Sequence, residues 1–71
     1  MKNNVELLKM VIKICESENT ITLDSGSTEE HYWYSRMERT DEILCFYRGR
    51  SERPFMVIPI NYGVIVYEDE E

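Results

Sequence analysis

The spacing of the apolar residues changes once along this chain, at Asn19, and that change constrains the fold more than any other feature. Between Asn3 and about Ser17, apolar residues recur with the period of an α-helix, and neither glycine nor proline interrupts them. Asn3 followed three residues later by Glu6 resembles the capping box that begins many helices. From Thr20 onward the period is two, which is typical of strands. The sequence therefore predicts one N-terminal helix followed by a set of strands.

The predicted helix is apolar around more of its circumference than a surface helix needs. A helical projection places Met10 and Ile14 in an apolar arc about twice as wide as the ordinary stripe of roughly 100°. A single sheet covers only part of such an arc. We therefore expect Met10 and Ile14 to contact a second molecule.

Five short strands are expected after the helix, at 20–24, 31–37, 43–48, 55–60 and 64–67. Asn61-Tyr62-Gly63 fits a three-residue hairpin loop with glycine in the left-handed conformation. Pro59 has no amide hydrogen to donate, so it should lie near a strand end or a bulge. Because short loops favour pairing between neighbours, the predicted fold class is α+β, with an N-terminal amphipathic helix packed on a curved five-stranded antiparallel meander. The alternative is a small barrel with the helix outside.

The last three predicted strands are apolar on both faces, whereas an antiparallel sheet with one face in water should alternate. Closure of the sheet into a barrel would account for this pattern. A second copy of the chain, or a different protein, packed on the outer face would account for it equally well. Taken with the broad apolar arc, the pattern predicts a protein partner or a homodimer.

The length of 71 residues leaves room for one domain, which we place at 1–67, with an acidic tail at 68–71. That size excludes dinucleotide-binding enzymes, barrel enzymes and kinases. No apolar run approaches the roughly 20 residues that cross a bilayer, and no signal peptide is evident, so a soluble cytoplasmic protein without membrane contact is expected. Two cysteines, Cys15 and Cys45, are too few for a disulfide framework and are expected to be buried and reduced.

Catalytic and metal-binding patterns are missing from the sequence. His31 is the only histidine, and its neighbours on a strand alternate between faces, so no nucleophile–histidine–acid arrangement is implied. One histidine and two isolated cysteines lack the paired spacing of zinc ligands. No phosphate-binding glycine loop is present. We expect no enzymatic activity, no cofactor and no metal.

The aromatic run Tyr32-Trp33-Tyr34 is the most distinctive local feature. Three consecutive rings on a strand must face both ways, so at least one lies away from the main core. In one interpretation these rings only pack beneath the helix and across the sheet. In the other, Tyr32, Trp33 and Tyr34 form an interface together with Met10 and Ile14, because aromatic side chains are enriched at interfaces.

Three arginines stand close together at Arg48, Arg50 and Arg53, next to a glycine. Guanidinium groups bind phosphate or carboxylate through two parallel hydrogen bonds. Pairing with the chain's own carboxylates would make this an ordinary polar loop. The functional interpretations are salt bridges to an acidic partner or to the chain's own acidic tail, and a site for a small anionic ligand such as a nucleotide.

Fourteen acidic and eight basic residues give a net charge of −6, which disfavours direct binding to nucleic acid. Carboxylates along one side of a small domain would steer it toward a basic partner. The residues considered for this role are Glu16, Glu18, Glu29, Glu30, Glu68 and Asp69. By elimination, the sequence predicts a non-catalytic regulator or inhibitor that binds another macromolecule, of a kind frequent among small acidic proteins of phages and mobile elements. The alternative is the binder of a small anionic ligand.

Overall fold

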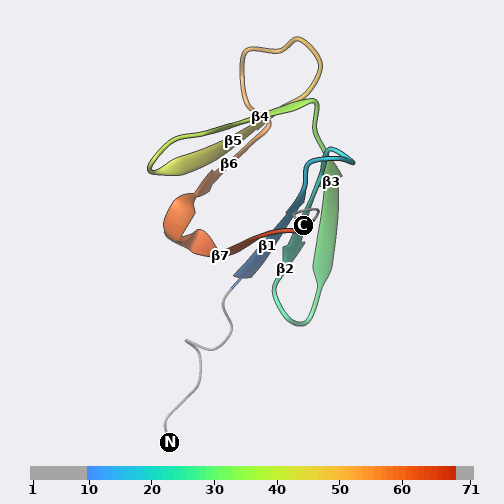
Figure 1. Ribbon diagram of the computed structural model, residues 1–71, viewed down its shortest axis with the longest axis vertical. Coiled ribbons are helices and arrows are strands. Elements are labelled where there is room, and N and C mark those ends of the chain that lie inside the picture. Colours follow the sequence, from blue (N-terminus) through green and yellow to red (C-terminus); the bar gives the residue numbers. More distant parts are fainter. Residues whose placement is uncertain (1–9, 69–71) are drawn as a thin grey trace, which may run out of the picture.

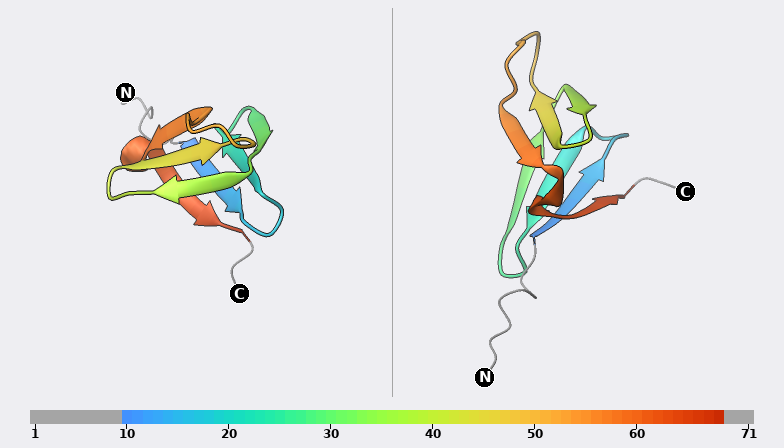
Figure 2. Two further views of the ribbon diagram at one scale, coloured as in Figure 1. Left: turned by 90° about the horizontal axis from the view of Figure 1, so that it is seen from above. Right: turned by 90° about the vertical axis from the view of Figure 1, so that its left-hand side faces the viewer.

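A computed structural model describes residues 10–68, and these form two small β-sheets (Figure 1). In chain order the elements are β1 (Met10–Cys15), β2 (Thr20–Asp24), β3 (Glu29–Trp33), β4 (Arg36–Arg39), β5 (Ile43–Tyr47), β6 (Met56–Pro59), the 3₁₀ turn η2 (Ile60–Tyr62) and β7 (Gly63–Tyr67). The larger sheet has the strand order β3-β2-β1-β7, and the smaller one has the order β4-β5-β6. All pairs are antiparallel except β1 and β7, which are parallel. Figure 2 shows the smaller sheet lying across the larger one.

The prediction of an N-terminal helix was wrong for its second half, and its first half lies outside the described residues. Residues 10–15 form β1, the strand that pairs with β2 on one side and β7 on the other. Ile12 and Ile14 are fully buried at a spacing of two residues. Between them Lys13 points to the outer face, as strand alternation requires. The β-branched residues of this segment suit a strand hydrogen-bonded on both sides better than a helix.

The predicted strand at 31–37 is two strands with a corner at Tyr34-Ser35. Asn19, in the β1–β2 turn, holds this corner: its side-chain amide donates to the carbonyl oxygens of Tyr34 at 3.1 Å and Ser35 at 3.2 Å. The Tyr34 amide donates back to the Asn19 carbonyl at 3.0 Å. Asn19 itself has a positive φ of 56°, which asparagine tolerates better than most residues. The corner carries the chain from the larger sheet into the smaller one.

The predicted hairpin at 61–63 was also wrong. The η2 turn carries the chain out of the smaller sheet, and β7 then pairs with β1 rather than with β6. Gly63 has φ −171°, an extended conformation, and it is needed there because a Cβ would overlap the Met10 carbonyl. Pro59 ends β6, which confirms its predicted place near a strand end. Over residues 10–68 the fold is therefore neither α+β, nor a five-stranded meander, nor a barrel with a helix outside.

The core lies between the two sheets and joins residues from four strands and the corner. Its buried members are Ile12, Ile14, Ile21, Tyr34, Leu44, Phe46 and Ile58. The rings of Tyr34 and Phe46 are 5.2 Å apart at an interplanar angle of 59°, a tilted contact that aromatic pairs favour. The corner is thus held by the packing of Tyr34 against Phe46 and by the hydrogen bonds of Asn19.

Candidate functional site

Trp33, Arg48 and Phe55 form one surface cluster, which we call the aromatic–arginine patch. Trp33 ends β3 and is 56% exposed. Arg48 follows β5 directly, and its guanidinium carbon lies 4.0 Å from the centre of the Phe55 ring and 5.9 Å from that of Trp33. Its Nε donates to the Trp33 carbonyl oxygen at 2.8 Å. These contacts fix a cation between two rings at the molecular surface.

The arginine-rich loop after Arg48 extends from this patch. The amide of Gly49, a residue with φ 61°, donates to the Ser35 hydroxyl at 2.8 Å, which ties the loop to the corner. Ser51 closes the far side, because its hydroxyl donates to the Arg53 carbonyl and accepts from the Arg53 amide, both at 3.1 Å. Arg50 and Arg53 are exposed, and within residues 10–68 neither forms an ion pair. The loop therefore presents two unneutralised cations beside the patch.

The five residues predicted as an interface lie in different environments. Ile14 and Tyr34 are buried in the core, so they have no surface to offer a partner. Met10 and Tyr32 are half-buried and pack against that core. Tyr32 also donates its hydroxyl to Glu30 at 2.9 Å, and this hydrogen bond raises the pKa of the tyrosine. Trp33 is the one member of the set that is freely exposed.

The predicted acidic residues are partly gathered around Lys13 on the outer face of the larger sheet. The Lys13 Nζ lies 3.4 Å from Asp24 and 3.8 Å from Glu29. The hydrogen bond to Asp24 raises the pKa of Lys13 most, and the negative charges of Glu29 and Glu68 add to that effect. This face is therefore partly neutralised rather than uniformly acidic.

The remaining acidic residues do not join that group. Glu16 and Glu18 are exposed in the β1–β2 turn, and Asp69 lies outside the described residues. Glu30 accepts the hydrogen bond of Tyr32 on the edge strand β3. His31 donates to or accepts from Thr22 at 2.9 Å and lies 3.5 Å from Glu29, so it sits in a polar surface network.

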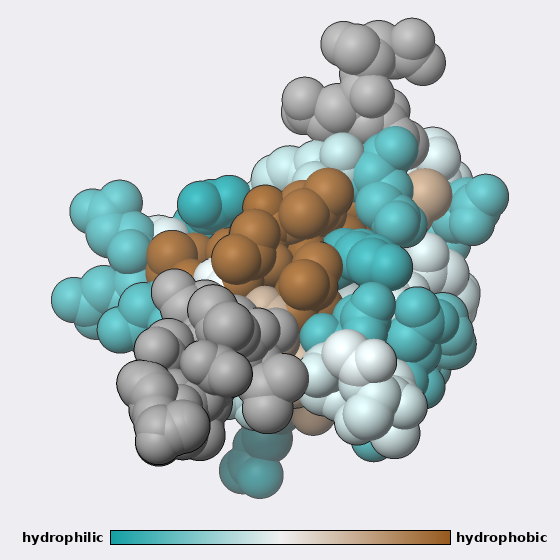
Figure 3. Space-filling model, turned by 90° about the horizontal axis from the view of Figure 1, so that it is seen from below, coloured by the Kyte–Doolittle hydropathy of each residue, from teal (hydrophilic) through white to brown (hydrophobic). Residues whose placement is uncertain are grey.

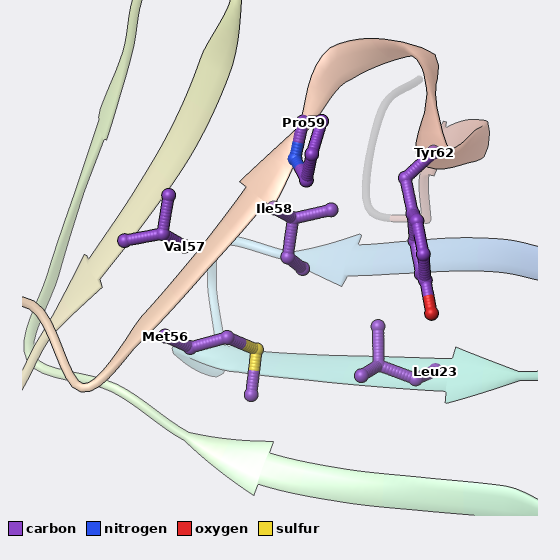
Figure 4. A pocket seen from close by; sticks show the side chains of 6 residues that line it. All are labelled: Leu23, Met56, Val57, Ile58, Pro59 and Tyr62. Atoms are coloured by element: carbon purple, nitrogen blue, oxygen red, sulfur yellow. The ribbon is translucent and has the colours of Figure 1, made fainter.

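Apolar surface remains elsewhere on the molecule, and Figure 3 shows a group of apolar side chains on the face seen from below. A hollow of about 300 Å³ lies between β6 and β2. In Figure 4, the Tyr62 ring extends from η2 toward Leu23 on β2, and Ile58 points into the hollow from β6. A second hollow of about 370 Å³ is lined by Asp41, Glu42, Ile60 and Asn61. Neither hollow gathers a nucleophile together with a base.

Among residues 10–68 no three histidine, cysteine or carboxylate side chains come close enough to hold a metal ion. The described residues include no helix of sufficient length and apolarity to traverse a bilayer. Cys15 and Cys45 are free, and both are half-buried rather than buried as the sequence suggested.

The chain matches no protein-family model, no curated protein and no solved structure. Sequence reasoning found Trp33 and Arg48 separately but missed that they form one cluster with Phe55. It also missed the role of Asn19. An asparagine directly before a predicted strand could have indicated a turn residue with a positive φ, because asparagine adopts this conformation more readily than most residues.

Proposed function

We propose that this protein is a non-catalytic interaction protein that binds another macromolecule through the aromatic–arginine patch. The observation that carries the proposal is the exposed Trp33 with Arg48 fixed between its ring and that of Phe55. Tryptophan and arginine are enriched among the residues that dominate binding energy at interfaces. Because Arg48 is already immobilised, little conformational entropy is lost when a partner covers the patch.

The charges beside the patch favour a partner protein with an acidic surface at this site, in place of the basic partner expected from the acidic residues. Arg50 and Arg53 stand next to the patch without internal ion pairs among the described residues. Carboxylates of a partner would complement them and would accelerate association. Nucleic acid is disfavoured as a partner because the whole chain carries a net charge of −6.

We infer a role as a regulator or inhibitor in the cytoplasm. A reducing compartment suits the two free cysteines, since such thiols are rare in disulfide-forming compartments. A binding role without catalysis suits the environment of His31, whose ring contacts Thr22 and Glu29 on an open sheet face rather than in a cleft.

The test is capture of a partner by the immobilised full chain from a cell lysate, with identification of bound proteins by mass spectrometry. A specific partner should bind the natural chain and be lost with Trp33→Ala. Tyr62→Ala is the matched control, because Tyr62 is 54% exposed and lies away from the patch. A partner captured equally by Trp33→Ala, or no specific partner at all, contradicts the proposal.

The second candidate function is binding of a small anionic ligand, which the exposed Arg50 and Arg53 favour. The geometry supports it less, because the Nε of Arg48 already donates to Trp33 and its guanidinium covers Phe55. A thermal-shift screen with mono-, di- and cyclic nucleotides distinguishes the two functions. Stabilisation by a nucleotide that disappears with Arg50→Ala favours the ligand, and a flat screen favours the macromolecular partner.

A further inference from the structure

The four edge strands of the two sheets differ in how they are protected. Open edges attract other strands, and natural proteins shield them with charges, proline or short length. The edge strand β3 carries two glutamates and a histidine, and β4 carries two arginines and a glutamate. The edge strand β6 has four residues and ends in Pro59. The fourth edge strand among residues 10–68 is β7, with the sequence Gly-Val-Ile-Val-Tyr; it contains no charged residue and no proline of its own, and Arg39 of β4 contacts only its last side chain, that of Tyr67.

The backbone of β7 offers a regular set of hydrogen-bonding groups to its open side. The amide of Glu68 donates to the carbonyl of Ile14 at 2.8 Å, so the backbone groups of Glu68 point toward β1. Successive residues of a strand turn their N–H and C=O groups alternately to the two sides. Val64 and Val66 therefore bond to β1. Gly63, Ile65 and Tyr67 turn their amides and carbonyls toward the open edge.

We propose that a second copy of this chain pairs with β7 in antiparallel orientation, around a two-fold axis at Ile65. In this register Ile65 faces Ile65 of the partner subunit, and Gly63 faces Tyr67 of the partner subunit. The Ile65 pair and the two Gly63–Tyr67 pairs join residues whose amides and carbonyls point to the open edge, so the pairing forms about six backbone hydrogen bonds. Two copies of β7 therefore pair over their full length, and each outward-pointing donor of one copy meets an acceptor of the other. A closed two-fold interface requires such self-complementarity.

The side chains of β7 suit the same register. Val64 and Val66 are 51% and 40% exposed on the outer face. The two-fold places Val64 opposite Val66 of the partner subunit in a non-hydrogen-bonded pair, where side chains approach most closely. Tyr67 would lie across from the glycine of the other strand, an arrangement that shields a glycine at an edge.

The charge distribution favours a second copy over a foreign strand. The β7 strand carries no charge, and Glu68 follows it immediately. In an antiparallel pair the two Glu68 residues lie at opposite ends of the ladder, so these two carboxylates stay apart. The central contact is then apolar on both faces. No charged group of the partner is needed to complete it.

The test is the solution mass of the full chain by light scattering over a range of concentrations, with twice the chain mass of 8.5 kDa expected. Val64→Glu with Val66→Glu sets like charges opposite one another in both pairs and should weaken the dimer on the order of tenfold. Val64→Lys with Val66→Glu sets opposite charges there and should retain it. Val57→Glu is the control, because Val57 is 49% exposed on the other sheet.

Both double variants carry the same Val66→Glu change, and Lys13 on β1 is the register neighbour of this position in both. The two variants therefore differ only in the charge at position 64. Circular dichroism checks that each variant is folded. A second measurement is amide hydrogen exchange: the amides of Gly63, Ile65 and Tyr67 should gain protection as concentration rises. A natural chain that stays monomeric, or a dimer equally stable in both double variants, overturns the proposal.

Discussion

The Nε of Arg48 donates to the carbonyl oxygen of Trp33 across 2.8 Å, while its guanidinium carbon lies 4.0 Å from the centre of the Phe55 ring. One planar side chain therefore holds a backbone carbonyl and an aromatic ring at once. The ends of β3 and β5 are joined by this side chain at the place where the exposed indole stands. A lysine has the same charge but lacks the planar fork that makes both contacts together.

Arg48→Lys should accordingly lower the free energy of unfolding by about 1 kcal/mol, from the weakened hydrogen bond and the lost stacking. The fluorescence of Trp33, the only tryptophan, should shift because its cationic neighbour moves. Thermal unfolding and emission spectra measure the two effects. Arg50→Lys, in the exposed loop, should change neither, and an unchanged Arg48→Lys protein would argue against the fixed patch.

Asn19 should be the residue of the β1–β2 turn that is least tolerant of change. Asn19→Ala removes two side-chain hydrogen bonds to the corner and puts alanine, which tolerates a φ of 56° less well than asparagine, at this position, so we expect a loss of about 2–3 kcal/mol. Asn19→Gly relieves the backbone strain and should cost about 1 kcal/mol less than alanine. Urea unfolding of the pair measures the difference. Equal losses in the two variants would show that backbone strain contributes nothing there.

The sequence predicted the strands whose turns are local. The predicted strand 20–24 coincides with β2, and the strand predicted from Ile43 begins where β5 begins. In β1, however, Val11 and Cys15 are apolar on the outer face, which hides the alternation of Ile12 and Ile14. Such a short apolar run does not distinguish a helix from a strand. Its partner β7 lies at the far end of the chain, and no local pattern contains that information.

The candidate site, too, was only partly predictable from local sequence patterns. The pattern identified Trp33 as a residue to examine, because three consecutive aromatic residues on a strand cannot all face one core. It gave no reason to place Phe55 beside Arg48, since that contact depends on the path of the whole arginine loop. The bend at Ser35 was also hidden, because the alternation of 31–37 continues through it. Pairings and corners between distant segments are set by tertiary packing rather than by local periodicity.

Gly63→Ala should separate β1 from β7. The added Cβ would overlap the carbonyl of Met10, which is backbone and has little freedom to move. We expect a loss of about 2 kcal/mol in the free energy of unfolding and faster amide exchange along β7. Gly49→Asn is the control, because open space surrounds Gly49 and asparagine tolerates its φ of 61°. Comparable stability of the two variants would contradict the close approach of β1 and β7.

The Asp24 carboxylate should make the fold sensitive to acid. It accepts a hydrogen bond from the Gly26 amide at 2.8 Å and lies 3.4 Å from Lys13, and these contacts hold its pKa below the ordinary 3.8. A carboxyl whose pKa is lower in the folded state stabilises the fold above its unfolded pKa, and this contribution disappears as pH falls through the folded value. Asp24→Asn should therefore lower the melting temperature near neutral pH and should match the natural chain in strong acid. Glu52→Gln, in the exposed loop, should follow the natural chain throughout, and melting curves from acid to neutral pH compare the three. A difference that persists in strong acid would assign the effect of Asp24→Asn to the turn rather than to the charge.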